Sequence, residues 1–232
     1  MPPTPQHQRR WLIGTIVGVL LAVGLVVGAP WVYAKFLVPE APDPLTLSTP
    51  DVVRTVPEGP LEIDGSWEIQ PGSEAGYRLN EVLYDEQMTV VGRTESVAGV
   101  LVIEREMLTE ARVVVDVGSI VTDESARDAF FRRALDTTSF PEAVFELTEP
   151  VDVSAIGRAN VPLLTEGAGT LTLHGVSRPV TATLEVQRTP DGVEVLATVE
   201  VLLADYGMSA PDLGWVVVEP AGTVEALLQL AH

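Results

Sequence analysis

The chain has 232 residues, and its 46% hydrophobic content is enough for a folded core and excludes a disordered protein. Its net charge of −19 comes without any lysine or arginine cluster that follows a phosphate backbone, which excludes nucleic acid as a partner. Cysteine is absent and histidine occurs three times, so disulfides and thiolate catalysis are excluded and no metal site is expected.

The first element along the chain is an uncharged run from Trp11 to Ala29, and we predict a transmembrane helix over residues 11–33. A cleavable signal peptide is the alternative, because Arg9 and Arg10 precede the run. These arginines indicate that residues 1–10 form a cytoplasmic tail. The chain is then a single-pass protein of the cytoplasmic membrane with an extracytoplasmic C-terminal domain. Glycines spaced four apart in the run leave a homodimer open, although glycine is common in such helices.

The next segment, residues 34–64, is a proline-rich linker with six prolines between Leu37 and Pro60. Such a composition favours an extended polyproline-like chain, so the linker is predicted to be a semi-stiff stalk. The chain beyond Arg10 carries all 33 acidic residues and 12 of the 14 basic ones, a net charge of −21. Anionic lipid repels such a domain, which is therefore not expected to lie flat on the membrane.

Residues 65–232 alternate between apolar and polar side chains, which is the pattern of strands with one buried face. In residues 193–203 every odd position is apolar, whereas Glu194, Thr198 and Glu200 are expected to face water. We predict eight to ten strands. The other clear runs are Ala111–Val117, Ala143–Thr148, Gly169–His174, Val180–Val186 and Thr223–Leu230, separated in places by turns at Pro190-Asp191-Gly192, Gly175 and Glu219-Pro220.

One helix is predicted, beginning near Asp123 as the N-cap and ending after Arg132 and Arg133, cations that suit a helix C-terminus. Its apolar residues share a face at a spacing of four, so the helix is amphipathic and is expected to cover the end of a barrel. The strands suit a closed antiparallel barrel or a sandwich, and closure removes exposed sheet edges. Small inward residues favour a cavity over a packed core.

Three segments resemble the YceI-like family of extracytoplasmic lipocalin-like proteins. They are VVVDVGSIVTDESARDAFFRRALDTTSFPEAVF at 113–145, GTLTLHGVSRPV at 169–180, and the Asp-Tyr-Gly-Met run at 205–208, where members usually have Asp-Phe-Gly-Met. This chain has Phe130 or Phe131 where members commonly carry a histidine after the Arg-Asp pair. The resemblance covers the outer domain only. It implies an all-β, antiparallel lipocalin-like β-barrel with one short helix, placed after the membrane helix.

The resemblance also implies an amphiphilic isoprenoid-type ligand in the lumen, such as a polyprenyl chain or quinone, with no other cofactor. The predicted pocket residues are apolar, and each is equally compatible with an ordinary core position. They are Phe130, Phe131, Leu135, Phe140, Phe145, Val115, Leu173 and Val199. Guanidinium groups match phosphate oxygens, so head-group candidates lie at the barrel mouth. They are Arg127, Arg133, Arg178 and, as a polar neighbour, His174.

His174 shares a strand face with Thr170 and Thr172, opposite the apolar lining, so local hydrogen bonding is its expected role. No nucleophile motif of the G-x-S-x-G kind is present, and a non-enzymatic binding protein is favoured. Two alternatives remain open at this stage. One is a structural or interaction module with a packed barrel, and the other is a hydrolase that pairs His174 with a carboxylate.

Overall fold

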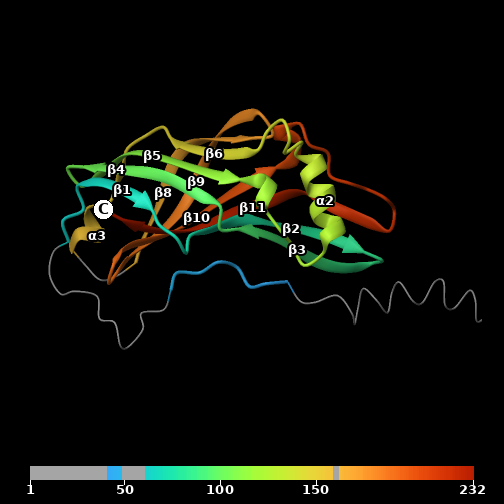
Figure 1. Ribbon diagram of the computed structural model, residues 1–232, viewed down its shortest axis with the longest axis horizontal. Coiled ribbons are helices and arrows are strands. Elements are labelled where there is room, and N and C mark those ends of the chain that lie inside the picture. Colours follow the sequence, from blue (N-terminus) through green and yellow to red (C-terminus); the bar gives the residue numbers. More distant parts are fainter. Residues whose placement is uncertain (1–40, 49–60, 159–161) are drawn as a thin grey trace, which may run out of the picture.

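Figure 1 shows the computed structural model, which describes residues 41–48, 61–158 and 162–232. The predicted cytoplasmic tail, the predicted membrane helix at 11–33 and much of the predicted linker lie outside these residues. In the part of the chain that is described, no helix is long and apolar enough to cross a membrane.

The described residues form eleven strands, two α-helices and two 3-10 helices. The strands are β1 (Gly65–Ile69), β2 (Glu74–Leu83), β3 (Glu86–Thr94), β4 (Val97–Glu104), β5 (Met107–Asp116), β6 (Glu142–Leu147), β7 (Val151–Asp152), β8 (Leu163–Leu173), β9 (Val176–Thr189), β10 (Gly192–Leu202) and β11 (Val216–Ala231). The helices are η1 (Val117–Ser119), α2 (Ser125–Ala134), α3 (Ser154–Arg158) and η2 (Leu203–Tyr206).

The sheet closes into an antiparallel barrel of eight strands, because β1 pairs with both β4 and β11. Between these partners the order is β4-β5-β6-β8-β9-β10-β11, and β2 and β3 extend the sheet from the other half of β11. The predicted all-β barrel is therefore confirmed. Closure pairs the strand edges that an open sheet would expose.

The two ends of the barrel are closed differently. The helix α2 lies across the end where β2 and β3 turn and β11 begins, and we call this end the mouth (Figure 1). At the opposite, closed end lie α3, the start of β1 and the C-terminus (Figure 1). The sequence predicted one helix, and α3 is a second one. It was not predicted, because five residues are too few to show a helical periodicity.

The predicted N-cap of α2 is wrong by one residue. Glu124 caps the helix, and its Oε1 accepts a hydrogen bond from the Ala126 amide at 3.2 Å. Asp123 instead forms an ion pair with Arg127, four residues on. The carboxylate of Asp128 is buried and accepts from the backbone and the hydroxyl of Thr122, which ties α2 to the preceding loop. All three acids sit in or before the first turn, where negative charge is favoured.

The predicted turn at Glu219-Pro220 is also wrong, because β11 continues through it. Pro220 has no partner on either β10 or β2, and the register with β2 shifts between Val218 and Gly222. A bulge of this kind accommodates a residue that has no backbone N–H to donate. The sequence signal for a chain break was therefore real, but it marks a bend inside one long strand.

Some hairpin turns carry no glycine, asparagine or proline, and the sequence did not indicate them. Arg105 and Glu106 both adopt positive φ, at 54° and 62°, in the turn between β4 and β5. Their two amides donate to the carboxylate of Asp64 at 2.8 and 2.9 Å. A side chain from the preceding segment thus supports a left-handed conformation that these residue types rarely adopt.

An extended segment of the linker, residues 41–48, packs along the outside of the barrel, and we call it the strap (Figure 1, blue). Leu45 within it is buried, and Ser48 binds Glu194 through both its amide (2.7 Å) and its hydroxyl (2.8 Å). Glu194 was predicted to face water, yet it is fully buried. The period-two pattern placed it on the outer face correctly, but the strap covers that face.

Candidate functional site

The mouth end of the barrel is hollow. A cavity of about 730 Å³, which we call the mouth chamber, lies between α2, β2, the start of β11 and the segment after β10. Its volume falls within the ~300–1,000 Å³ range typical of small-molecule sites. Most of the lining is apolar. Lining residues from these and neighbouring elements include Leu79, Leu83, Val90, Ile120, Phe130, Phe131, Leu173, Leu203, Met208, Leu213 and Trp215.

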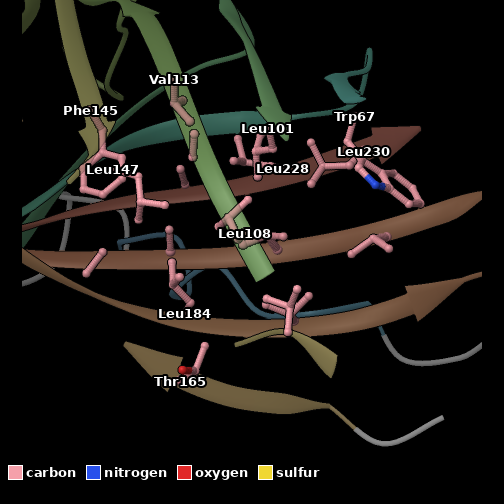
Figure 2. Close-up of a pocket in the computed structure, with 18 of the residues that line it drawn as sticks. Trp67, Leu101, Leu108, Val113, Phe145, Leu147, Thr165, Leu184, Leu228 and Leu230 are labelled. Carbon is pink, nitrogen blue, oxygen red and sulfur yellow. The ribbon is translucent and has the colours of Figure 1, made fainter. Parts of the chain in front are cut away.

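A second, narrower cavity of about 130 Å³ continues down the barrel axis, and we call it the inner chamber. Figure 2 shows side chains from several strands pointing into it, with Thr165 contributing an oxygen to an otherwise aliphatic and aromatic lining. The two chambers share lining residues, so they adjoin one another inside the barrel. The shared residues are Ala75, Val115, Ala143 and Val224.

Trp67 seals the far end of the inner chamber. Its side chain is 2% exposed, and its Nε1 donates to the carbonyl of Ile63 at 2.8 Å. The ring of the C-terminal residue His232 lies against it, with centroids 3.9 Å apart. Trp67 and His232 thus close this end of the lumen, whereas the mouth chamber lies at the other end, beside α2.

An aromatic stack joins β2 to α2 in the wall of the mouth chamber. The rings of Tyr77 and Phe131 lie 4.6 Å apart at 15°, and both residues line the mouth chamber. Burial raises the pKa of Tyr77, only partly offset by the nearby Arg127 cation. The Tyr77 phenol therefore remains neutral and able to donate a hydrogen bond across the physiological pH range.

A charged pair also lines the mouth chamber. Arg127 on α2 lies 3.5 Å from the carboxylate of Glu81 on β2, and it pairs as well with Asp123. The side chain of Glu81 is 10% exposed and that of Arg127 22%. This pair places a guanidinium and a carboxylate at the edge of an apolar cavity, which is an arrangement suited to a polar head group.

Seven of the eight predicted pocket residues line the two chambers. Phe130, Phe131, Leu135, Val115 and Leu173 line the mouth chamber, and Phe145, Val199 and again Val115 line the inner chamber. Phe140 lies outside both linings, with its ring 5.4 Å from that of His174 in an edge-to-face contact. The part that these residues play in binding stays a prediction.

The predicted head-group residues divide in the same way. Arg127 lines the mouth chamber, whereas Arg133, His174 and Arg178 line neither chamber. Arg178 donates through Nε to the carbonyl of Asp205 at 2.8 Å, on the outside of the barrel. The structure thus places Arg127 at the mouth chamber and leaves Arg133, His174 and Arg178 outside both chambers.

His174 has a structural position at the tip of the hairpin between β8 and β9. It adopts φ of 52° and Gly175 φ of 72°, the paired left-handed conformations of a tight two-residue turn. Its Nδ1 donates to the carbonyl of Tyr206 at 3.0 Å. This bond joins the hairpin to η2, as the expected local hydrogen bonding requires.

Sequence reasoning missed Tyr77 and Glu81. Both lie on the inward face of β2, in a period-two series with Ala75, Leu79 and Leu83. The alternation along residues 75–83 was the available signal. Side chains two residues apart share a face, so the pattern places Glu81 on the same buried face as Leu79 and Leu83. Among the residues described, no cluster of three or more histidine or acidic residues is arranged to hold a metal ion.

An eight-stranded antiparallel barrel with an apolar lumen open at one end defines the lipocalin-like class of barrels. The family model for the YceI-like domain matches residues 67–230, nearly the whole barrel, and the chain belongs to this family. A comparison of the sequence with curated proteins gives no match.

Two solved structures share the fold. A polyisoprenoid binding domain from Saccharophagus degradans, implicated in plant cell wall breakdown, is 22% identical with a TM-score of 0.56; the match covers 71% of this chain and 97% of that domain. BcnA from Burkholderia cenocepacia is 13% identical with a TM-score of 0.54, and the match covers 71% of this chain and 99% of BcnA.

Proposed function

We propose that the protein binds an amphiphilic isoprenoid-type lipid in its barrel, at the extracytoplasmic face of a membrane in which residues 11–33 anchor it. The observation that carries the proposal is the pair of adjoining, mostly apolar chambers inside the barrel. The family and the polyisoprenoid binding domain among its structural relatives support the class of ligand. The uncharged run after Arg9 and Arg10 supports the anchor.

Apolar burial supplies the driving force. At ~0.8 kcal/mol per CH₂, one five-carbon isoprene unit contributes on the order of 3–4 kcal/mol before the cost of ordering. The mouth chamber holds the wide part of the ligand. The inner chamber has room for only a few molecules of water, at ~30 Å³ each, so it holds a slender end of the ligand. The narrow end limits how far a chain enters, so cavity length sets selectivity.

The polar end of the ligand lies near Arg127 and Tyr77. A phosphate group pairs with the guanidinium, and a quinone oxygen accepts from the neutral phenol of Tyr77. Glu81 already occupies one side of Arg127, so a head group approaches from the other side or displaces Asp123.

The test is to fill the boundary that the two chambers share with a large side chain. In full-length protein purified in detergent, Val115→Trp fills the junction of the two chambers, and organic extracts are analysed by mass spectrometry for bound lipid. Val114→Trp is the matched control, because it makes the same change one residue away on β5, outside both linings. We expect lipid with the wild type and the control, and little with Val115→Trp.

Equal lipid content in the two variants would contradict binding inside the barrel. Absence of lipid from the wild type, together with no uptake of added polyprenyl phosphate or quinone, would instead support a packed interaction module. The hydrolase alternative has no such support, because His174 is bonded to Tyr206 and packs against Phe140 apart from both chambers.

A further inference from the structure

Large apolar side chains gather around the opening of the mouth chamber. Leu213 and Trp215 are 57% and 50% exposed, and Phe130 on α2 is 44% exposed, although all three also line the chamber. The ring of Tyr84 stacks on Trp215, with centroids 5.8 Å apart. We call these four residues the rim. Tryptophan and tyrosine are the residues enriched where protein meets the lipid head groups.

The strap has a defined direction along the outside of the barrel. Near the end of the strap, Ser48 binds Glu194, which pairs with Gln229 on β11. Near its start, the carbonyl of Pro42 accepts from Arg78, which pairs with Thr223 on β11. These two residues are six positions apart on β11, or about 20 Å at ~3.3 Å per residue. The strap therefore runs from the mouth side toward the closed end.

The start of the strap lies beside the start of α2. Ala41 and Pro42 line a small polar pocket together with Thr122, Asp123 and Arg127. Arg93 donates to the carbonyl of Asp43 and also pairs with the buried carboxylate of Glu225 at 3.0 Å. The strap is thus held at both of its ends by charged groups on the outer face of the barrel, by Arg78 and Arg93 at its start and by the buried Glu194 at its end.

This attachment reverses the direction in which the domain is tethered. The first strand of the barrel starts at the closed end, and a free linker would suspend the domain from that end (Figure 1). With the strap in place, the tether leaves from residue 41, about 17 Å from the mouth tip of β2 at ~3.3 Å per residue. The eight residues from 33 to 41 reach about 25 Å when extended.

We infer that the rim is a membrane-docking surface and that the strap holds the mouth against the bilayer containing the predicted anchor. The inference rests on the proposed function, since it explains how a water-insoluble chain passes between bilayer and barrel. The docking force is apolar contact by the rim. The strongly acidic remainder of the domain is repelled by anionic lipid, so the partner surface is a zwitterionic bilayer.

Because the chain contains no cysteine, single-cysteine variants report position without background. Leu213→Cys places a fluorophore at the rim, and Leu164→Cys places it at another exposed leucine, near the closed end on β8. In full-length protein reconstituted into phosphatidylcholine vesicles, we expect a lipid-borne quencher to quench the label at 213 and aqueous iodide to quench the label at 164. Equal exposure of both labels to iodide would overturn the inference.

The contribution of the strap is measured with Arg93→Met combined with Glu194→Gln in the Leu213→Cys background, because this pair of changes removes contacts at both ends of the strap. Loss of lipid quenching at 213, with unchanged lipid content by mass spectrometry, supports an orienting role; unchanged quenching overturns it. The two hypotheses fail separately. Bound lipid with a rim label that stays in water removes the docking surface alone, whereas lipid quenching at the rim of an empty barrel removes the proposed function alone.

Discussion

The two ends of the barrel are built from the same strands but are finished in opposite ways. At the closed end the indole of Trp67 is buried, hydrogen-bonded to Ile63 and covered by the ring of His232. At the mouth the aromatic residues Phe130 and Trp215 are half exposed around a large cavity.

The difference shows how one apolar pattern serves two purposes. A large side chain that fills the lumen stabilises the fold, because it removes its own surface and that of its neighbours from water. A large side chain beside an empty lumen offers that surface to a ligand. In this protein the closed end supplies stability, and the mouth retains apolar surface for binding.

Removing the Trp67 side chain that seals the closed end is expected to have the largest effect. Trp67→Ala is expected to lower the free energy of unfolding by about 3–5 kcal/mol, because it leaves a large cavity in the packed end. Urea denaturation measures the change. Trp67→Phe, which keeps a ring but loses the bond to Ile63, should cost clearly less; equal losses would mean that packing does not dominate there.

Arg127→Met tests the polar side of the mouth. It leaves the carboxylate of Glu81 without its cation in an apolar lining, and we expect a loss of about 2–3 kcal/mol in stability. Added polyprenyl phosphate should also bind more weakly. The double variant Arg127→Met with Glu81→Leu is expected to regain much of the stability but not the phosphate affinity, and recovery of both would exclude a head-group role.

The strap connects the two ends, and its attachment depends on pH. Burial raises the pKa of Glu194, but hydrogen bonds from Gln229, Ser48 and Gln187 outweigh it and hold the pKa below its usual value. A lowered pKa stabilises the fold fully above the ordinary value of ~4.3, and the contribution is lost as pH falls through the lowered value.

We therefore expect strap residues 41–48 to gain hydrogen exchange below about pH 4 while the barrel strands remain protected. Glu194→Gln should produce the same release at neutral pH, at a cost of about 1–2 kcal/mol. Exchange that rises equally in the strap and in β10 at low pH would instead indicate global unfolding.

The aromatic stack offers a finer test at the mouth. Phe131→Leu keeps an apolar side chain but removes the stacking on Tyr77, so ligand affinity and stability should each fall by about 1 kcal/mol or less. Isothermal titration with a short polyprenyl lipid measures the first effect. An unchanged affinity would place the ligand away from this wall of the chamber.

The smallest expected effect is a gain. The hydroxyl of Tyr206 is buried and has no hydrogen-bond partner among the described residues, and burial raises its pKa. Tyr206→Phe should therefore raise stability by up to about 1 kcal/mol, measured by thermal unfolding. A loss instead would show that the hydroxyl has a partner, such as an ordered water.

Local sequence patterns predicted much of the fold. Period-two alternation in 193–203 predicted which residues of β10 face the lumen, and Val193, Val195, Val199 and Val201 all lie in the core. The predicted pocket residues that line the chambers are apolar residues of inward-facing strand positions and of the helix region, and their part in binding stays a prediction. Tyr77 and Glu81 were not among the predicted residues, because their polar groups do not mark them as lining an apolar cavity until β2 is placed against α2.

Other features could not be seen locally, because they depend on contacts between distant segments. The proline at 220 lies in a bulge of β11, since β2 pairs on both sides of it. The left-handed turn at Arg105 and Glu106 depends on Asp64, about forty residues earlier. Phe140 was predicted as a pocket residue, but it lines neither chamber and its ring packs on His174, on the hairpin between β8 and β9.

By itself the sequence determined the class of fold, the inward face of its strands and the helix that covers one end, because side-chain periodicity follows directly from strand and helix geometry. Only the tertiary structure decided that the lumen is hollow at the mouth and sealed at Trp67, and that the strap buries Glu194. Those outcomes depend on how volumes and charges from distant segments meet, and no local pattern encodes that sum.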